Sequence, residues 1–151
     1  RNRLMLELMA RACMMVSEVL TLNAKDIEDR KATIPDPKSG KEAEVAFLPQ
    51  KVPDRLKKFI SANGIEPGDR IFPITYAAAR IVVKKAGDWV GIHLKPHDLR
   101  RHAATYASRS GTPLEIVSKV LSRHSNLSIT QRYCGKISDA EAMRWIDNLH
   151  E

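Results

Sequence analysis

The chain has 151 residues, 43% of them hydrophobic, which allows one well-buried core but not two ordinary domains. Its two cysteines, Cys13 and Cys134, lie far apart and suggest neither a disulfide framework nor a zinc site, and no apolar run approaches the roughly 20 residues that a membrane span needs. The sequence therefore predicts a cytoplasmic protein. The net charge is +7, with seven basic against two acidic residues between positions 90 and 133. This concentration favours a polyanionic partner, although a solubilising basic surface explains the charge alone equally well.

The first half of the chain contains helical and β-prone segments. Helically spaced apolar residues over 4–20 predict an amphipathic helix that breaks near Ala12-Cys13. Residues 31–34 and 44–48 are β-prone runs on either side of a polar segment with Pro and Gly, which predicts a hairpin. Helices are predicted over 52–62, ended by Asn63-Gly64, and over about 76–86.

The second half is predicted to be helical throughout. A helix covers 98–109, and Pro113, within a capping box, starts another that ends at Ser125-Asn126. A short helix over 127–133 and a capped terminal helix from Ser138 follow. The predicted fold class is α+β, mainly helical, with a small β-hairpin sheet on one edge and a single domain over residues 1–151.

Four side chains suited to phosphoryl transfer occur at ordered spacings in the basic stretch. His97 and Arg100 are three residues apart and share one face of a helical turn; His124 follows Arg100 by 24 positions, and Tyr133 follows His124 by nine. The guanidinium can bind a phosphate through two donors, the imidazoles can add further contacts, and the phenol can act as nucleophile. Such a set needs neither a metal nor another cofactor. His97 and His102, five residues apart, do not share a helical face, which argues against a metal site.

This pattern resembles the catalytic half of the tyrosine recombinases, or phage integrases. Their signature reads His-x-x-Arg, then Leu-Gly-His some two dozen residues later, then a nucleophilic Tyr nine residues on. The resemblance runs from about residue 4 to 149 and implies site-specific DNA recombination or integration through a 3′-phosphotyrosyl bond at Tyr133, with Arg100, His97 and His124 at the phosphate.

The resemblance also implies partners for the chain. These are double-stranded DNA, further copies of the chain in a synaptic tetramer on DNA, and an N-terminal DNA-binding domain that residues 1–151 lack. In the family the terminal helix often docks on a neighbouring subunit, so Trp145 packs either there or in the core.

Further basic residues are assigned by the same resemblance. In the family a Lys on a mobile β-hairpin protonates the leaving hydroxyl, and Lys38 is the first candidate for this acid, with Lys41 the second. The residues expected to contact DNA are Arg101, Lys41, Arg123, Lys119 and Arg132.

Two positions depart from the family pattern. The first motif, Gly-x-Arg-hydrophobic-Ser/Gly-Glu, reads here as residues 13–18, so Met15 stands where the family has the other arginine of the phosphate clamp. Losing such a donor typically costs on the order of 10² to 10³ in rate, which predicts impaired catalysis. Arg11, one helical turn earlier, is a possible substitute, although a surface position is the simpler interpretation. Arg123 stands at the Gly of Leu-Gly-His, where it could add a phosphate contact.

Two other functions fit the same residues. One is a non-catalytic DNA-binding module of the same fold, in which Met15 reflects a loss of chemistry. The other is a type IB-like topoisomerase, which uses similar residues without synapsis. On the recombinase interpretation, we expect His97, Arg100, His124 and Tyr133 to line one basic concave face, with Met15 at its edge.

Overall fold

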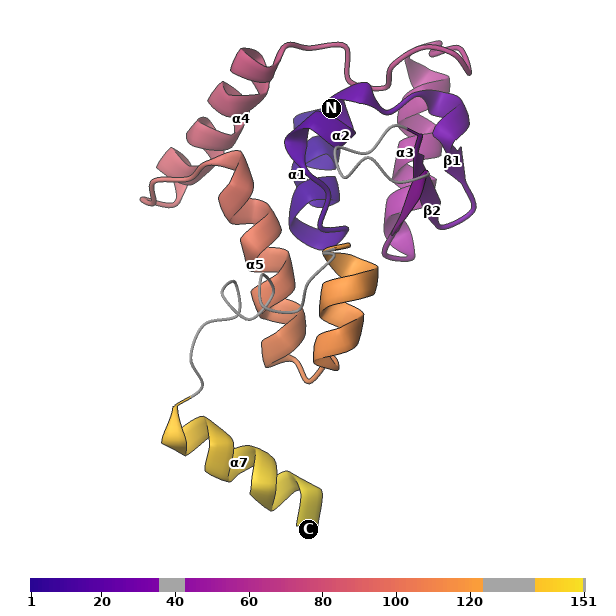
Figure 1. Cartoon of the computed structure of the whole chain (residues 1–151). Helices are drawn as coiled ribbons and strands as arrows, with labels where there is room; N and C mark the ends of the chain where they lie inside the picture. Colours follow the sequence, from indigo (N-terminus) through magenta and orange to yellow (C-terminus); the bar gives the residue numbers. More distant parts are fainter. Residues whose placement is uncertain (36–42, 124–137, 151) are drawn as a thin grey trace.

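A computed structural model describes residues 1–35, 43–123 and 138–150 of the chain. Helix α1 (Asn2–Arg11) and helix α2 (Val16–Thr21) lie at its centre (Figure 1). The predicted break between them is confirmed. Cys13 has a φ of 55°, in the left-handed region that ends a helix.

A small antiparallel sheet lies on one edge, as predicted. Its strands are β1 (Ile27–Glu28), β2 (Lys31–Ile34) and β3 (Glu44–Phe47), in the order β1-β2-β3, and a short 3₁₀ helix, η1 (Ala24–Asp26), leads into it. The β2–β3 register runs from the Lys31–Phe47 pair to the Ile34–Glu44 pair. The predicted hairpin is confirmed. Strand β1 was not predicted, because two residues are too few to show the alternation of apolar and polar side chains that indicates a strand.

Two helices follow the sheet. Helix α3 (Lys51–Ala62) ends where predicted, with Gly64 at a φ of 61°. Helix α4 (Tyr76–Trp89) runs three residues beyond its predicted end and includes Gly87. A Cβ at Gly87 would lie 2.6 Å from the Ile92 carbonyl oxygen. This glycine therefore lets the chain after α4 pack closely against the helix, and it does not end the helix.

Helix α5 (Pro96–Arg109) begins two residues before its predicted start, with Pro96 in its first turn. The carboxylate of Asp98 accepts the Lys95 N–H at 2.9 Å and caps the helix. The next helix, η2 (Ile116–Leu121), has π geometry where an α-helix was predicted. Ser122 N–H donates to the Val117 carbonyl at 2.9 Å, and the helix ends before the predicted Ser125-Asn126.

Two apolar clusters hold these elements together. The main core is formed by α1, α2, α3, α4 and the sheet, with Phe72 fully buried within it. A smaller cluster contains Cys13, Ala103, Ala104 and Val117 and joins the α1–α2 turn to α5 and η2. This second cluster matters for function because it fixes three segments of the sequence motifs against one another.

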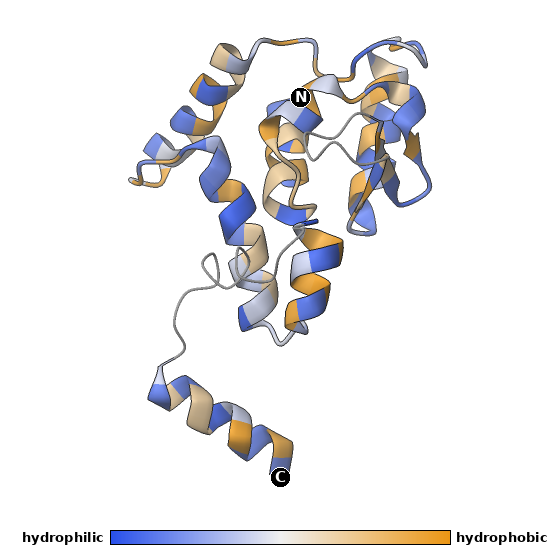
Figure 2. Cartoon of the chain, in the orientation of Figure 1, coloured by the Kyte–Doolittle hydropathy of each residue, from blue (hydrophilic) through white to orange (hydrophobic). Residues whose placement is uncertain are grey.

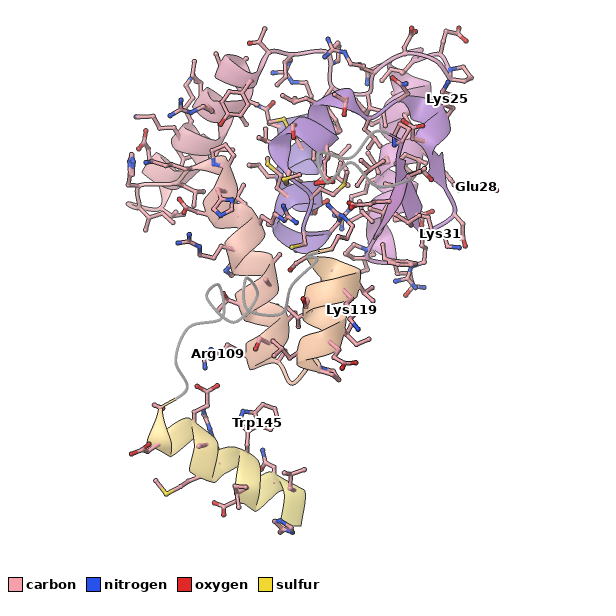
Figure 3. The ribbon with its side chains drawn as sticks, viewed as in Figure 1. Lys25, Glu28, Lys31, Arg109, Lys119 and Trp145 are labelled. Atoms are coloured by element: carbon pink, nitrogen blue, oxygen red, sulfur yellow. The ribbon has the colours of Figure 1, made fainter. Side chains whose placement is uncertain are left out.

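Helix α7 (Asp139–His150) lies apart from the core in Figure 1. Its predicted cap is confirmed, since the Ser138 hydroxyl accepts the Glu141 N–H at 3.2 Å. An Arg109–Glu141 ion pair ties the helix to the end of α5. Figure 3 shows Trp145 pointing towards that end of the molecule, where its ring lies over Gly111.

The apolar side chains of α7 remain exposed, including Trp145 at 38% and Leu149 at 72%. They appear as orange bands on an isolated helix in Figure 2. The alternative that Trp145 packs in the core is therefore wrong. No helix in the described part of the chain is both long and apolar enough to cross a bilayer.

Candidate active site

Arg100 lies where the small apolar cluster brings three segments together. It is buried, and its Nη2 donates a hydrogen bond to the Ser122 carbonyl, just beyond η2. Its own carbonyl accepts a hydrogen bond from the Cys13 thiol at 3.5 Å. The first motif, the His-x-x-Arg helix and the residues preceding His124 therefore meet around this arginine.

Arg123 lies at the same junction and is held by two carboxylates. Its Nη2 lies 2.6 and 2.7 Å from the two oxygens of Glu18, and its Nε donates to Glu44 at 3.1 Å. Only 6% of the Arg123 side chain is exposed. The ion triad connects the end of η2 to the start of α2 and to the first residue of β3.

Glu18 links this triad to the first motif. Its Oε1 accepts the backbone N–H of Met15 at 2.8 Å, as expected for a Glu at the third position of a helix that caps the first turn. Because the same oxygen contacts Arg123, a single carboxylate separates that guanidinium from the Met15 backbone. Sequence reasoning included Glu18 only as part of the motif and missed its partner Glu44.

Met15 and Arg11 have different environments. Met15 is half-buried and precedes α2, at the edge of the junction. The Arg11 side chain is 57% exposed, and its Nη1 lies 3.9 Å from Glu7 on the preceding turn of α1. The exposure of Arg11 favours its interpretation as a surface residue over a substitute for the missing clamp arginine, and its ion pair directs it towards Glu7.

His97 lies in the exposed first turn of α5. Partial burial lowers the pKa of its imidazole from the ordinary value of 6.5, the charges of Arg101 and Arg100 lower it further, and Asp98 acts in the opposite direction. The lowered pKa favours the neutral imidazole, which can accept a proton or a hydrogen bond.

The remaining predicted site residues fall into two groups. Arg101 on α5 and Lys119 on η2 are exposed; Figure 3 labels Lys119. The others lie outside the described residues: Lys38, Lys41, His124, Arg132 and Tyr133. His124 directly follows Arg123 in the sequence, so the junction borders the segment that carries the second imidazole.

Comparison with known proteins identifies the family of the chain. The model of the phage integrase family matches residues 1–138. The chain belongs to the phage integrase family. A tyrosine recombinase of Pseudothermotoga lettingae is 30% identical over 99% of this chain and 54% of its own length. Tyrosine recombinase XerA of Saccharolobus solfataricus is 28% identical over 92% of this chain and 47% of its own length. The chain thus spans about half the length of these relatives.

Solved structures show the same fold as this phage integrase family member. XerH recombinase bound to a palindromic difH substrate, in a post-cleavage complex, has a TM-score of 0.78 at 22% identity, covering 100% of this chain and 46% of that one. The catalytic domain of bacteriophage HP1 integrase has a TM-score of 0.67 at 21% identity, covering 86% and 71%. The predicted fold class, a tyrosine recombinase catalytic domain, is confirmed.

Proposed function

We propose that residues 1–151 form one catalytic domain of a site-specific DNA recombinase or integrase. The observation that supports this most is Arg100, which is buried at the junction of the family motifs and fixed by the Ser122 carbonyl. A guanidinium fixed in this way can meet a phosphate without first being ordered, which favours stabilisation of the transition state. Family membership supports the reaction class, strand cleavage and rejoining.

The proposed reaction is a transesterification at phosphorus. The hydroxyl oxygen of Tyr133 attacks the scissile phosphodiester, a bond forms between that oxygen and the 3′-phosphate, and the bond from phosphorus to the 5′-oxygen breaks. The phenolic proton passes to a base, for which neutral His97 is the candidate, and the 5′-oxygen takes a proton from Lys38. Because the phosphotyrosyl bond preserves the energy of the cleaved linkage, rejoining needs no ATP.

The charged groups share the work of binding the phosphate. Arg100 would donate to non-bridging oxygens in a fork that lysine cannot reproduce, and His124 would add a further donor. Duplex DNA would be held by phosphate contacts from Arg101, Lys41, Lys119 and Arg132. An additional N-terminal domain would complete the clamp around the duplex.

Helix α7 suits assembly on DNA. Its apolar face, with Trp145 and Leu149, is exposed. Docking of this face on a neighbouring copy would bury it, which favours a synaptic tetramer as the active form.

Met15 supports a second candidate function. It leaves the first clamp position without a cation, a loss worth about 10² to 10³ in rate where nothing replaces it. A chain without the second guanidinium would be a DNA-binding module of the same fold that does not cleave.

Covalent trapping tests the proposal. The probe is a pool of duplexes, randomised around a fixed linkage, with a nick that lets the short 5′-hydroxyl fragment diffuse away after cleavage. Incubated without divalent metal and then denatured, the chain should carry DNA covalently, and Tyr133→Phe should carry none. If neither protein carried covalently attached DNA, although both still bound the duplex noncovalently, the non-catalytic module would be favoured.

A further inference from the structure

Arg123 has a backbone conformation suited to glycine. Its φ is 56°, in the left-handed region that residues with a side chain rarely adopt, and its position corresponds to the Gly of the Leu-Gly-His pattern that the chain resembles. The local backbone conformation is therefore one that suits glycine, but the residue that adopts it is an arginine. An arginine at such a position calls for a compensating interaction.

The compensating interaction lies beside the deficient first motif. Both oxygens of Glu18 contact Arg123, and Glu18 also caps the helix turn that begins at Met15. The guanidinium of Arg123, which comes from the turn after η2, therefore lies near residue 15. The first motif lacks its own cation at that place.

Both arginines at the junction retain unused donors. Arg100 Nε and Arg123 Nη1 are buried and have no hydrogen-bond partner in the described ranges. The two residues are neighbours at the junction, because Arg100 Nη2 binds the carbonyl of Ser122, the residue before Arg123. Leaving a buried charged donor without a partner is unfavourable, so two such donors at one junction favour an acceptor that binds there.

We propose that Arg123 supplies the second guanidinium of the phosphate clamp and binds a non-bridging oxygen of the scissile phosphodiester, in place of the arginine that position 15 lacks. Glu18 and Glu44 orient it, and Nη1 is the donor left for the phosphate. This inference rests on the function proposed above. It removes the reason to expect impaired catalysis from Met15, because the clamp then has two guanidinium groups.

The test exchanges the guanidinium between the two positions. Four proteins are compared with the nicked duplex pool: the chain itself, Arg123→Gly, Met15→Arg, and Met15→Arg combined with Arg123→Gly. Arg123→Lys serves as a further variant that leaves Glu18 and Glu44 a counter-ion should Arg123→Gly fail to fold. Arg80→Ala, which removes an exposed arginine from α4, is the matched control.

Arg123→Gly should form adduct at least about 100-fold more slowly than the chain itself, as expected for loss of a phosphate donor. Arg123→Lys should also be slowed, since lysine lacks the planar fork. The double variant should recover most of the rate because it returns the guanidinium to position 15. Arg80→Ala should react like the starting protein.

A methylphosphonate at the scissile linkage separates phosphate binding from a purely structural role. Replacing one non-bridging oxygen by a methyl group removes the negative charge that the second guanidinium would neutralise. The deficits of Arg123→Gly and Arg123→Lys should therefore shrink at least about tenfold on this probe, whereas a folding defect would slow both probes equally.

Several outcomes would overturn the inference. Unchanged adduct formation by Arg123→Gly, or an equal loss on both probes, would mean that Arg123 only neutralises Glu18 and Glu44. Those two outcomes would leave the proposed function intact. Adduct from the double variant but not from the starting chain would overturn the inference and would favour the non-catalytic module as the function of the chain. No adduct from any protein would remove the proposed function, and this inference with it.

Discussion

At the scale of single residues, two left-handed positions define the candidate site. Cys13 and Arg123 have φ values of 55° and 56°, and both stand where the resembling family pattern has glycine. The Cys13 thiol lies 3.7 Å from the Ser122 hydroxyl, so the two turns also pack on each other. Both positions therefore have a backbone conformation that suits the glycine of the family pattern, although each carries a side chain.

His97 provides a prediction at this scale. Its pKa is lower in the folded chain than its ordinary value of 6.5, so the unfolded chain binds this proton more tightly. Its contribution to stability is therefore present in full above pH 6.5 and is lost as the pH falls through the lowered pKa. Urea unfolding of the chain and of His97→Asn at pH 7.5 and 5.5 measures this contribution.

The stability of the chain relative to His97→Asn should be greater at pH 7.5 than at pH 5.5. Taking the difference between the two proteins removes the pH dependence of the other groups. A difference that stays constant, or that grows as the pH falls, would contradict the lowered pKa.

At the scale of elements, the sequence predicts best where periodicity and caps agree. The α1–α2 break, the hairpin, α3 with its Gly64 cap and the capped α7 are all confirmed. The early start of α5 could have been read from Pro96 and Asp98, which are ordinary N-terminal signals. The π geometry of η2 could not, because its apolar spacing is equally compatible with an α-helix.

A pair of substitutions tests the different anchoring of α7 and the core. Phe72 is fully buried, whereas Trp145 lies on a helix with an exposed apolar face. Phe72→Ala should lower the free energy of unfolding by about 3 to 5 kcal/mol, and Trp145→Ala by less than about 1 kcal/mol. Urea unfolding followed by far-UV circular dichroism measures both. Similar losses from the two substitutions would show that α7 belongs to the cooperative core.

At the scale of the whole molecule, the motif spacings indicated which segments would meet but not how. Sequence order predicted that residues near Met15, Arg100 and His124 share a site, and the structure brings the first motif, Arg100 and Arg123 together. The Glu18–Arg123–Glu44 triad was not predictable, because Arg123 is 105 residues from Glu18 and 79 residues from Glu44 along the chain and no spacing rule connects them. The placement of Lys38, His124 and Tyr133 remains a prediction.

The basic charge of the molecule predicts the form of its DNA affinity. Binding to duplex DNA should weaken steeply with salt, because each neutralised phosphate releases counterions. Lys119→Ala should reduce the slope of log affinity against log salt by about 1, while Lys25→Ala, an exposed lysine beside the sheet, should leave it unchanged. Fluorescence anisotropy at several salt concentrations gives the slopes. A salt-independent affinity would contradict phosphate contacts as the source of binding.

The most direct test of the central claim is to identify the atom that becomes joined to DNA. The chain has three tyrosines, at positions 76, 106 and 133, and trypsin places them in different peptides, with Tyr133 in residues 133–136. Mass spectrometry of the nuclease-trimmed, trypsin-digested adduct should find a 3′-nucleotide phosphate on that peptide alone. A nucleotide on the peptide of Tyr76 or Tyr106, or one linked through its 5′-phosphate, would contradict the proposed cleavage mechanism.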